Sequence, residues 1–294
     1  MKIALLTRNG NLYSHKRLRE AAEKRGHEVH VIDHMKCLVD VSSQGCRLLH
    51  KGQPLLNFDA VIPRIGASVT YYGTTVVRQM EVMGVFTLNP AIAIAQSRDK
   101  LRSLQLMGER GIGLPRTIFT HSNDYPGEEI EILGGAPVVL KLTEGTHGVG
   151  VMLLKSDSAA EAVMEAFGGV ESDIILQEFI EEAGGEDVRC LVVGDEVVAA
   201  MLRKGKEGDF RSNLHQGGSA TVVEITDAER STAIAAARAM ELEMCGVDLL
   251  RSKRGPVVME VNSSPGLKGI ETATGIDVAE KVIKHIETRL SGRN

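Results

Sequence analysis

The chain has 294 residues, of which 43% are hydrophobic and 25% are charged, and its formal net charge at pH 7 is −5. This is a globular composition with room for two or three subdomains, and the negative charge disfavours electrostatic binding to nucleic acid. The apolar runs are far shorter than the roughly 20 residues that cross a bilayer, so we expect a cytoplasmic protein that binds neither membranes nor nucleic acid directly.

The first part of the chain, residues 1–90, alternates strand-like and helix-like segments. Ser14 is placed to cap a helix that runs to about Arg25. The candidate strands are three apolar runs, at residues 2–7, 28–32 and 58–63. Strands that alternate with helices form mainly parallel sheets, so we predict an N-terminal, doubly wound α/β domain.

The middle of the chain, residues 91–180, predicts helices followed by a small sheet. Residues 91–135 are expected to be largely helical, because apolar positions recur at helical spacing after Asp99 and Lys100. Residues 136–180 then predict the order strand, glycine loop, strand, helix, strand. We assign these segments to one subdomain.

Residues 181–294 form the last predicted subdomain. Two β-rich runs flank Gly194 and Asp195, which suit a hairpin turn. The later elements are predicted as a helix, two strands and a closing helix, at residues 227–245, 246–250, 256–261 and 277–290.

The most informative segment is the pair of apolar runs near residue 254, which predicts an antiparallel hairpin. If its turn is centred on Arg254, Asp248 lies directly opposite Glu260, and Asn262 shares their face. Two carboxylates among apolar neighbours repel unless a cation lies between them, and magnesium takes such oxygen ligands together with substrate phosphates. The alternative is three polar residues on a solvated sheet face.

Lys141 lies inside an apolar strand-like run, and a lysine there needs an anionic partner, for which a nucleotide phosphate would serve. The alternative is a lysine that extends to solvent from a sheet edge. The glycine-rich segment 144–150 would approach phosphates with its backbone amides, or form a simple turn, and His147 within it also suits the surface. No Gly-Lys-Ser/Thr follows, so the segment is not a P-loop.

Two further segments suit a nucleotide. Gln177 to Ile180 ends an apolar strand, where adenine finds an apolar slot and backbone hydrogen bonds. Arginine forks suit phosphates and carboxylates, although a solvated charged loop is the alternative. The cationic and polar side chains of this loop are Arg203, Lys204, Lys206, Arg211, Ser212 and Asn213.

Taken together and in order, these residues resemble the ATP-grasp superfamily. The sequence that carries the resemblance is Lys100, Lys141, the loop 145–150, Gln177-Glu178-Phe179, Asp187, Arg211-Ser212-Asn213, Asp248 and Glu260-Val261-Asn262. Over nearly the whole chain it is similar to the RimK family of ATP-dependent glutamate ligases. The closer motifs are Ile62-Pro63-Arg64-Ile65-Gly66, Ser97-Arg98-Asp99-Lys100, residues 189–195 and residues 208–215.

The resemblance implies a two-subdomain ATP-grasp fold after the N-terminal domain, and it assigns roles to single residues. The implied ATP contacts are Lys100 and Lys141 on phosphates, Glu178 and Phe179 on adenine, and Asp187 on the ribose. The implied transfer site is Arg211, Ser212 and Asn213, with Arg203 on the γ-phosphate. The implied metal ligands are Asp248, Glu260 and Asn262, which would hold two Mg²⁺ or Mn²⁺ ions with Glu260 as the bridge.

The function implied by the resemblance is addition of L-glutamate to the C-terminal tail of small-subunit ribosomal protein six, through an acyl-phosphate and with release of ADP. A homotetramer is implied as well. A ligase acting on a small molecule or an amino-group carrier protein fits the same residues. A non-catalytic, ATP-binding regulatory module is a third possibility, which the intact metal set disfavours. No GxGxxG follows the first strand, so a dinucleotide oxidoreductase is not expected.

Overall fold

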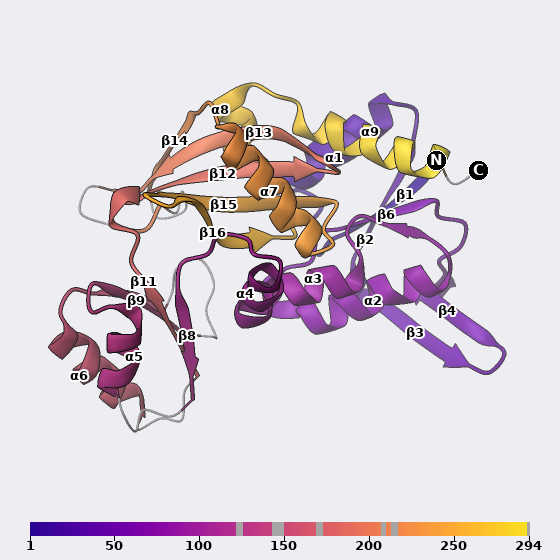
Figure 1. Ribbon diagram of the computed structural model, residues 1–294. Coiled ribbons are helices and arrows are strands. Elements are labelled where there is room, and N and C mark those ends of the chain that lie inside the picture. Colours follow the sequence, from indigo (N-terminus) through magenta and orange to yellow (C-terminus); the bar gives the residue numbers. More distant parts are fainter. Residues whose placement is uncertain (122–125, 143–149, 169–172, 207–209, 213–216, 293–294) are drawn as a thin grey trace.

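The computed structural model describes most of the chain: residues 1–121, 126–142, 150–168, 173–206, 210–212 and 217–292. Figure 1 shows an N-terminal α/β part, a small sheet covered by helices, and a larger antiparallel sheet. The C-terminal helices pack against this larger sheet. No helix in the described part of the chain combines the length and the apolar character that crossing a membrane requires.

The N-terminal domain is built on a parallel sheet in the order β2-β1-β6-β7. Side chains of β1 alternate between its faces, so that Ile3 and Leu5 contact α1 and α9 while Ala4 and Leu6 contact α2. Helices on both faces confirm the predicted doubly wound α/β domain. Its elements are β1 Lys2–Leu6, α1 Tyr13–Lys24, β2 Glu28–Ile32, β6 Ala60–Pro63, α2 Thr70–Val82 and β7 Phe86–Thr87.

Two features of this domain differ from the sequence prediction. Ser14 does not cap α1, because the helix already begins at Tyr13 and Leu12 is its N-cap. The Ser14 hydroxyl instead accepts a hydrogen bond of 2.9 Å from the backbone N–H of Leu267. An additional antiparallel sheet, which extends beside α2 in Figure 1, was not predicted. Its strands are β3 Cys37–Ser42, β4 Gly45–His50 and β5 Gln53–Pro54.

The middle subdomain is an antiparallel sheet in the order β10-β9-β11-β8, packed on α5 and α6. The strand and helix order predicted for residues 136–180 is confirmed in the described residues. Residues 91–135 are less helical than predicted, because they also contain β8. The elements of this sheet and its helices are β8 Thr117–Thr120, α5 Pro126–Leu133, β9 Val138–Leu142, β10 Val151–Leu154, α6 Asp157–Gly168 and β11 Ile174–Glu178. The two helices that precede them, α3 Ala91–Arg98 and α4 Lys100–Glu109, do not pack on this sheet: Ala93 and Met107 lie in the core of the larger C-terminal sheet.

The C-terminal subdomain is a sheet in the order β14-β13-β12-β15-β16 with helices on both faces. Val188 and Cys190 of β12 pack under α7, whereas Leu191 and Val193 pack under α8 and α9. The predicted helix at 227–245 ends early, because Met244 already belongs to β15. The elements are β12 Glu186–Val193, β13 Glu196–Lys204, β14 Ser219–Val222, α7 Asp227–Ala239, β15 Met244–Ser252, β16 Gly255–Asn262, α8 Lys268–Thr274 and α9 Val278–Ser291.

Three short 3-10 turns complete the described structure: His34–Lys36, Ala67–Val69 and Glu181–Ala183. Helix α9, near the end of the chain, packs beside α1, near its beginning (Figure 1). Residues of both helices lie in one core with residues of β1 and β12. The first and last segments of the sequence therefore share one hydrophobic core.

Candidate active site

The hairpin β15–β16 places the predicted metal ligands together. Asp248 pairs directly with Glu260, as predicted, and Gly246 pairs with Asn262. The turn is not centred on Arg254, since Ser252 pairs with Gly255 across a two-residue turn. An extra residue in β16, Met259, then shifts the register by one and restores the opposition of the two carboxylates. The bulge lies next to the acidic pair and aims both side chains at one face.

Asp248 is completely buried, and arginines surround its carboxylate. Arg189, its neighbour across β12–β15, donates two hydrogen bonds of 2.6 Å, and Arg203 adds a third of 2.8 Å. Burial alone would raise the pKa of Asp248, but these two guanidinium groups hold that pKa at about 2. Asp248 is therefore a carboxylate at neutral pH, in a position that accepts cations.

Asp187 is a second buried acid, and it shares Arg203 with Asp248. Arg203 bonds both of its oxygens, at 2.6 and 2.7 Å, and the Ser212 hydroxyl donates to it as well. Burial, together with the charge of Asp248, raises the pKa of Asp187, while Arg203 opposes the rise. Both Asp187 and Arg203 are buried. A ribose contact from Asp187 or a γ-phosphate contact from Arg203 would therefore need one of these bonds to open.

Glu260 and Asn262 form the accessible side of the site. Glu260 is exposed, and Asn262 donates a hydrogen bond of 2.9 Å to it from its amide nitrogen. The guanidinium of Arg189 lies 3.9 Å from the Glu260 carboxylate, so it faces both acids. The chemistry of this donor set fits a magnesium ion, because two carboxylates and an amide converge on one face, although arginines bond both oxygens of Asp248 here. Among the described residues, no three His, Cys, Asp or Glu side chains gather as metal ligands.

The two predicted phosphate lysines also face Glu260. Burial lowers the pKa of Lys141 to about 8, and burial also lowers the pKa of Lys100, while the Glu260 carboxylate opposes both shifts. Lys141 donates a hydrogen bond of 2.7 Å to Gln177, and Lys100 donates one of 3.2 Å to the carbonyl of Leu142. The partner recorded for Lys141 is thus a neutral amide rather than the expected anion, which leaves its charge available to a phosphate.

The predicted adenine segment is tied to the neighbouring subdomain. Glu178 forms an ion pair with Arg254, and it accepts a hydrogen bond of 2.8 Å from the backbone N–H of Arg116. The ring of Phe179 meets that of Phe210 edge to face, with centroids 6.3 Å apart. The guanidinium of Arg211 lies 5.9 Å from the Phe210 ring. Asn213, His147 and most of the glycine loop lie outside the described residues.

The strand that carries Glu260 leads into a loop that is fastened to the N-terminal domain. Asn89 receives a hydrogen bond of 2.8 Å from the Met244 N–H and donates to the carbonyls of Met244 and Ser263, at 2.6 and 3.1 Å. Arg64 donates a bond of 2.6 Å to the carbonyl of Pro265. The β15–β16 hairpin is therefore held at the start of β15 and just after the end of β16 by Arg64 and Asn89 of the N-terminal domain.

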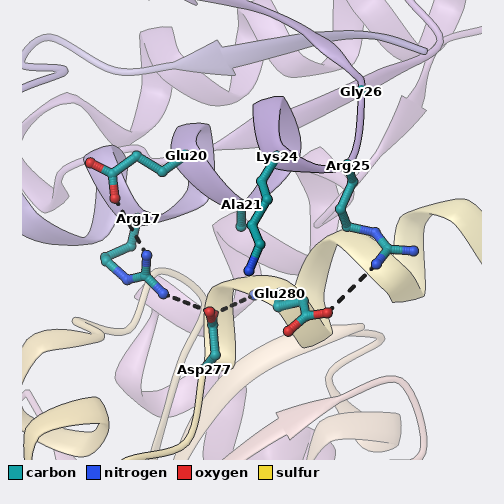
Figure 2. Close-up of a pocket in the computed structure, with 8 residues that line it drawn as sticks. All are labelled: Arg17, Glu20, Ala21, Lys24, Arg25, Gly26, Asp277 and Glu280. Atoms are coloured by element: carbon teal, nitrogen blue, oxygen red, sulfur yellow. Dashed lines mark hydrogen bonds and ion pairs between the residues drawn. The ribbon is translucent and has the colours of Figure 1, made fainter.

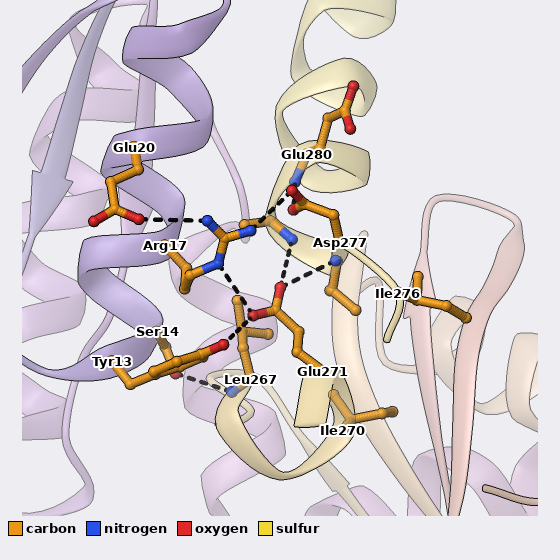
Figure 3. Close-up of polar contacts among 12 residues, drawn as sticks. Tyr13, Ser14, Arg17, Glu20, Leu267, Ile270, Glu271, Ile276, Asp277 and Glu280 are labelled. Atoms are coloured by element: carbon orange, nitrogen blue, oxygen red, sulfur yellow. Dashed lines mark hydrogen bonds and ion pairs between the residues drawn. The ribbon is translucent and has the colours of Figure 1, made fainter. Parts of the chain in front are cut away.

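Glu271 lies in α8, the helix that follows this loop, and fastens it to α1 and α9 (Figure 3). Its carboxylate accepts hydrogen bonds from Tyr13 at 2.9 Å and Arg17 at 3.3 Å. It also accepts from the backbone N–H groups of Val278 and Ala279, at 3.0 and 3.2 Å, which lie at the start of α9. One buried acid therefore links three helices.

A cavity of about 530 Å³ lies between α1 and α9 (Figure 2). Ion pairs cross it, including Arg17 with Asp277 at 2.8 Å and Arg25 with Glu280 at 3.6 Å. None of the predicted site residues is among those that line it. The residues that line it are Arg17, Glu20, Ala21, Lys24, Arg25, Gly26, Asp277 and Glu280.

Sequence reasoning did not single out Arg189 as a member of the site. It was noted only within a family motif, and its contact with Asp248 depends on the pairing of two strands that lie about sixty residues apart. The signal that could have found it is the alternation of β12. Arg189 is two residues from Asp187, so the two share a face.

Comparison with known proteins matches two families along the chain. Residues 1–94 match the RimK PreATP-grasp domain, and residues 97–286 match the RimK-like ATP-grasp domain. This chain belongs to the RimK family of ATP-grasp proteins. The predicted family and the ATP-grasp fold are thereby confirmed.

Named relatives cover almost the full length. A probable alpha-L-glutamate ligase from a Marinomonas species is 59% identical over 98% of this chain and 95% of its own. A probable alpha-L-glutamate ligase 1 from Pseudoalteromonas atlantica is 60% identical over 99% of this chain and 96% of its own. These relatives confirm the expectation of a ligase.

The fold has solved counterparts at lower sequence identity. The ATP-grasp ligase PsnB, complexed with a minimal precursor, magnesium and ADP, has a TM-score of 0.77 to this chain. It is 19% identical, and the match covers 98% of each chain.

Proposed function

We propose that this chain is an ATP-dependent ligase that adds L-glutamate to the C-terminal carboxylate of small-subunit ribosomal protein six. The observation that carries the proposal is the direct pairing of Asp248 with Glu260, with Asn262 beside them and two half-buried lysines in the field of Glu260. Support comes from relatives about 59% identical that are named probable alpha-L-glutamate ligases. A ribosomal acceptor implies that the enzyme works in the cytoplasm.

Asp248, Glu260 and Asn262 are the residues that would hold two Mg²⁺ or Mn²⁺ ions. PsnB, the fold neighbour, was crystallised with magnesium and ADP. When bound, such ions neutralise phosphate charge and polarise the phosphoryl group that is transferred.

The protein residues around the site bind and orient ATP. Lys141 and Lys100 carry positive charge toward the triphosphate, and the buried position of Lys141 strengthens its attraction for an anion. Glu178 and Phe179 lie at the end of β11, where adenine is proposed to bind. Arg203, Asp187 and Ser212 form the buried side of the nucleotide site, and Arg211 and Asn213 complete the transfer site.

The reaction proceeds in two steps. An oxygen of the acceptor carboxylate attacks the γ-phosphorus of ATP, which forms an acyl-phosphate and releases ADP. The α-amine of glutamate then attacks the acyl carbon, phosphate leaves with the bonding electrons, and the amine loses a proton to give the amide. No nucleophile from the protein is needed, so the task of these residues is electrostatic and positional.

Two other acceptors should be tested in the same assay, because the proposed metal ligands do not determine which acceptor binds. A small molecule or an amino-group carrier protein would use the same chemistry. A regulatory module would bind ATP without turnover. A homotetramer, implied by the family resemblance, is tested separately by light scattering on the purified protein.

The deciding experiment incubates the pure protein with Mg-ATP, L-glutamate and each candidate acceptor. Mass spectrometry of ribosomal protein six is expected to show added glutamyl residues, with ADP released in step. Modification of a small acceptor or carrier protein alone would replace the proposed substrate. Nucleotide binding without turnover for every acceptor would favour the regulatory module.

A further inference from the structure

Arg64 is a buried cation at the end of a parallel strand. It follows β6 directly, and only 8% of its surface is exposed. Its Nη2 donates to the carbonyls of Pro265 and Ser264, at 2.6 and 3.4 Å. Its Nε and Nη1 are buried and have no hydrogen-bond partner, and within the described residues no carboxylate pairs with it.

Arg98 contacts the residue that follows Arg64, and no carboxylate in the described part of the chain forms an ion pair with it. It is the last residue of α3 and is half-buried. Its Nη2 donates a bond of 2.8 Å to the carbonyl of Ile65, while its Nε is buried without a partner. Burial lowers the pKa of both arginines, that of Arg64 to about 10, and the charge of Arg98 lowers the pKa of Arg64 further.

Electrostatics ties this pair to the metal hairpin. Glu260 opposes the fall in the pKa of Arg98, so the two groups lie within each other's field. Arg64 is fastened to the loop that follows β16 through Pro265. The two arginines therefore border the catalytic side of the N-terminal sheet rather than a remote surface.

A buried and a half-buried cation that no carboxylate of the described residues pairs with are costly, and an anion would offset that cost. The planar fork of a guanidinium matches a carboxylate. Ligands of open α/β sheets bind outside the carboxyl ends of the strands, which is where Arg64 lies. The phosphates of ATP are assigned to Lys100 and Lys141, so the anion here is a different one.

We propose that Arg64 and Arg98 form the receptor for a substrate carboxylate that is not phosphorylated in the reaction. The inference rests on the proposed ligase function and names the residues that select its acidic substrate. A carboxylate that is to attack phosphorus keeps its lone pairs for that bond, whereas a spectator carboxylate gains from a fixed guanidinium pair. Free glutamate carries two spectator carboxylates, and an acidic acceptor tail carries them on its side chains.

A purely structural Arg64 would only fasten the loop at Pro265. Glu271 fastens the same loop from its other end without adding a cation to the pair, so Glu271→Gln is the matched control. Arg98→Gln is the main test, because Arg98 is half-exposed and donates to a single carbonyl, and Arg64→Lys is the second variant. Arg78→Gln, at an exposed position of α2, controls for the loss of one positive charge.

We expect Arg98→Gln and Arg64→Lys to raise the KM for one acidic substrate about 10- to 100-fold. The KM for ATP should change less than about threefold, because its phosphates bind elsewhere. A rise in the KM for glutamate places that substrate on the pair, and a rise for the acceptor places the tail there. Unchanged KM values for both, with only melting temperature or kcat lowered as in Glu271→Gln, would overturn the proposal.

A binding measurement separates this inference from the proposed function. Melting temperatures are recorded with magnesium, a non-hydrolysable ATP analogue and either glutamate, glutarate or glutamine. If the wild-type protein ligates no glutamate but is stabilised by glutarate, and Arg98→Gln removes that stabilisation, the ligase assignment fails and the carboxylate receptor stands. If neither these acids nor an acidic acceptor-tail peptide stabilises the wild type more than glutamine and an amidated tail peptide do, the receptor is refuted.

Discussion

Arg189 and Asp248 face each other across β12 and β15 and are joined by two hydrogen bonds of 2.6 Å. The same guanidinium lies 3.9 Å from Glu260, so one arginine serves both acids of the hairpin. A buried carboxylate is stable only with such compensation. A divalent cation at the proposed metal site would therefore compete with Arg189 for Asp248, and that competition is measurable.

Replacing Arg189 by methionine should destabilise the protein by about 3 kcal/mol, because buried Asp248 keeps only Arg203 as a compensating cation. Magnesium and a non-hydrolysable ATP analogue should recover much of this loss, since a bound divalent ion supplies the missing charge. Thermal unfolding of the variant with and without both ligands measures the effect.

The matched control is Arg251→Met. Arg251 also pairs with a buried carboxylate, Glu229, at 2.6 Å and from the same strand as Asp248. Its loss should destabilise the protein without any extra recovery by magnesium and nucleotide. Equal ligand-induced shifts in the two variants would show that Arg189 does not share the position of the cation.

The pairing of Asp248 with Glu260 could be predicted from sequence because it depends on contacts within one hairpin. The predicted position of the turn, however, was wrong. The prediction placed the turn on Arg254, whereas the structure combines a tighter turn with a bulge at Met259, and the two differences cancel. Alternation along one strand likewise places Asp187 and Arg189 on one face. Local pattern thus reaches as far as one strand and its hairpin partner.

Long-range contacts escaped prediction because no sequence pattern fixes them. Ser14 has the composition of a helix cap, but its hydroxyl is used by Leu267, about 250 residues later. The β3–β5 sheet also escaped, since its strands are short and largely exposed and show little of the alternation that marks a half-buried strand. The counter-ions of Asp248 depend on the pairing of β12 with β15, which only the folded chain reveals.

Nucleotide affinity should weaken at alkaline pH through Lys141. Burial lowers the pKa of this lysine to about 8, so above that pH the free protein holds it neutral and ATP must bind together with a proton. We expect affinity for Mg-ATP to fall about tenfold between roughly pH 7 and pH 9. Calorimetry in buffers of different ionisation enthalpy measures both the affinity and the proton uptake.

The control for this pH effect is Lys141→Arg, whose guanidinium stays charged over the whole range. Its affinity should be nearly independent of pH. The lowered pKa of Lys141 also affects the free energy of unfolding. It reduces that free energy below about pH 8, and the reduction disappears as the pH rises toward 10.5. A wild-type affinity that is flat in pH would contradict the placement of Lys141 on the phosphates.

Glu271 should be among the most sensitive positions outside the active site. Replacing it by alanine removes the acceptor of the Tyr13 hydroxyl and of the Ala279 N–H at the start of α9, and it takes one of three carboxylates from Arg17 (Figure 3). We expect a loss of about 3 kcal/mol in the free energy of unfolding. Urea denaturation measures this loss. The control is Glu20→Ala, because Glu20 pairs with the same Arg17 but is exposed. Equal losses for the two variants would refute the linking role of Glu271.

The central claim is that the acids of the hairpin hold the metal that activates ATP. Glu260→Gln keeps the size of the side chain and changes an exposed residue, so the melting temperature should stay within about 2 °C of wild type. Turnover should fall at least about a hundredfold, because the proposed metal site loses the negative charge of one of its ligands. Glu109→Gln, at the exposed end of α4, is the control and should be fully active.

The measurement is ADP release at saturating Mg-ATP, glutamate and acceptor, followed for the wild type and for both variants. We expect the folded Glu260→Gln protein to release ADP at a background rate while Glu109→Gln matches the wild type. Near-normal ADP release by Glu260→Gln would contradict it.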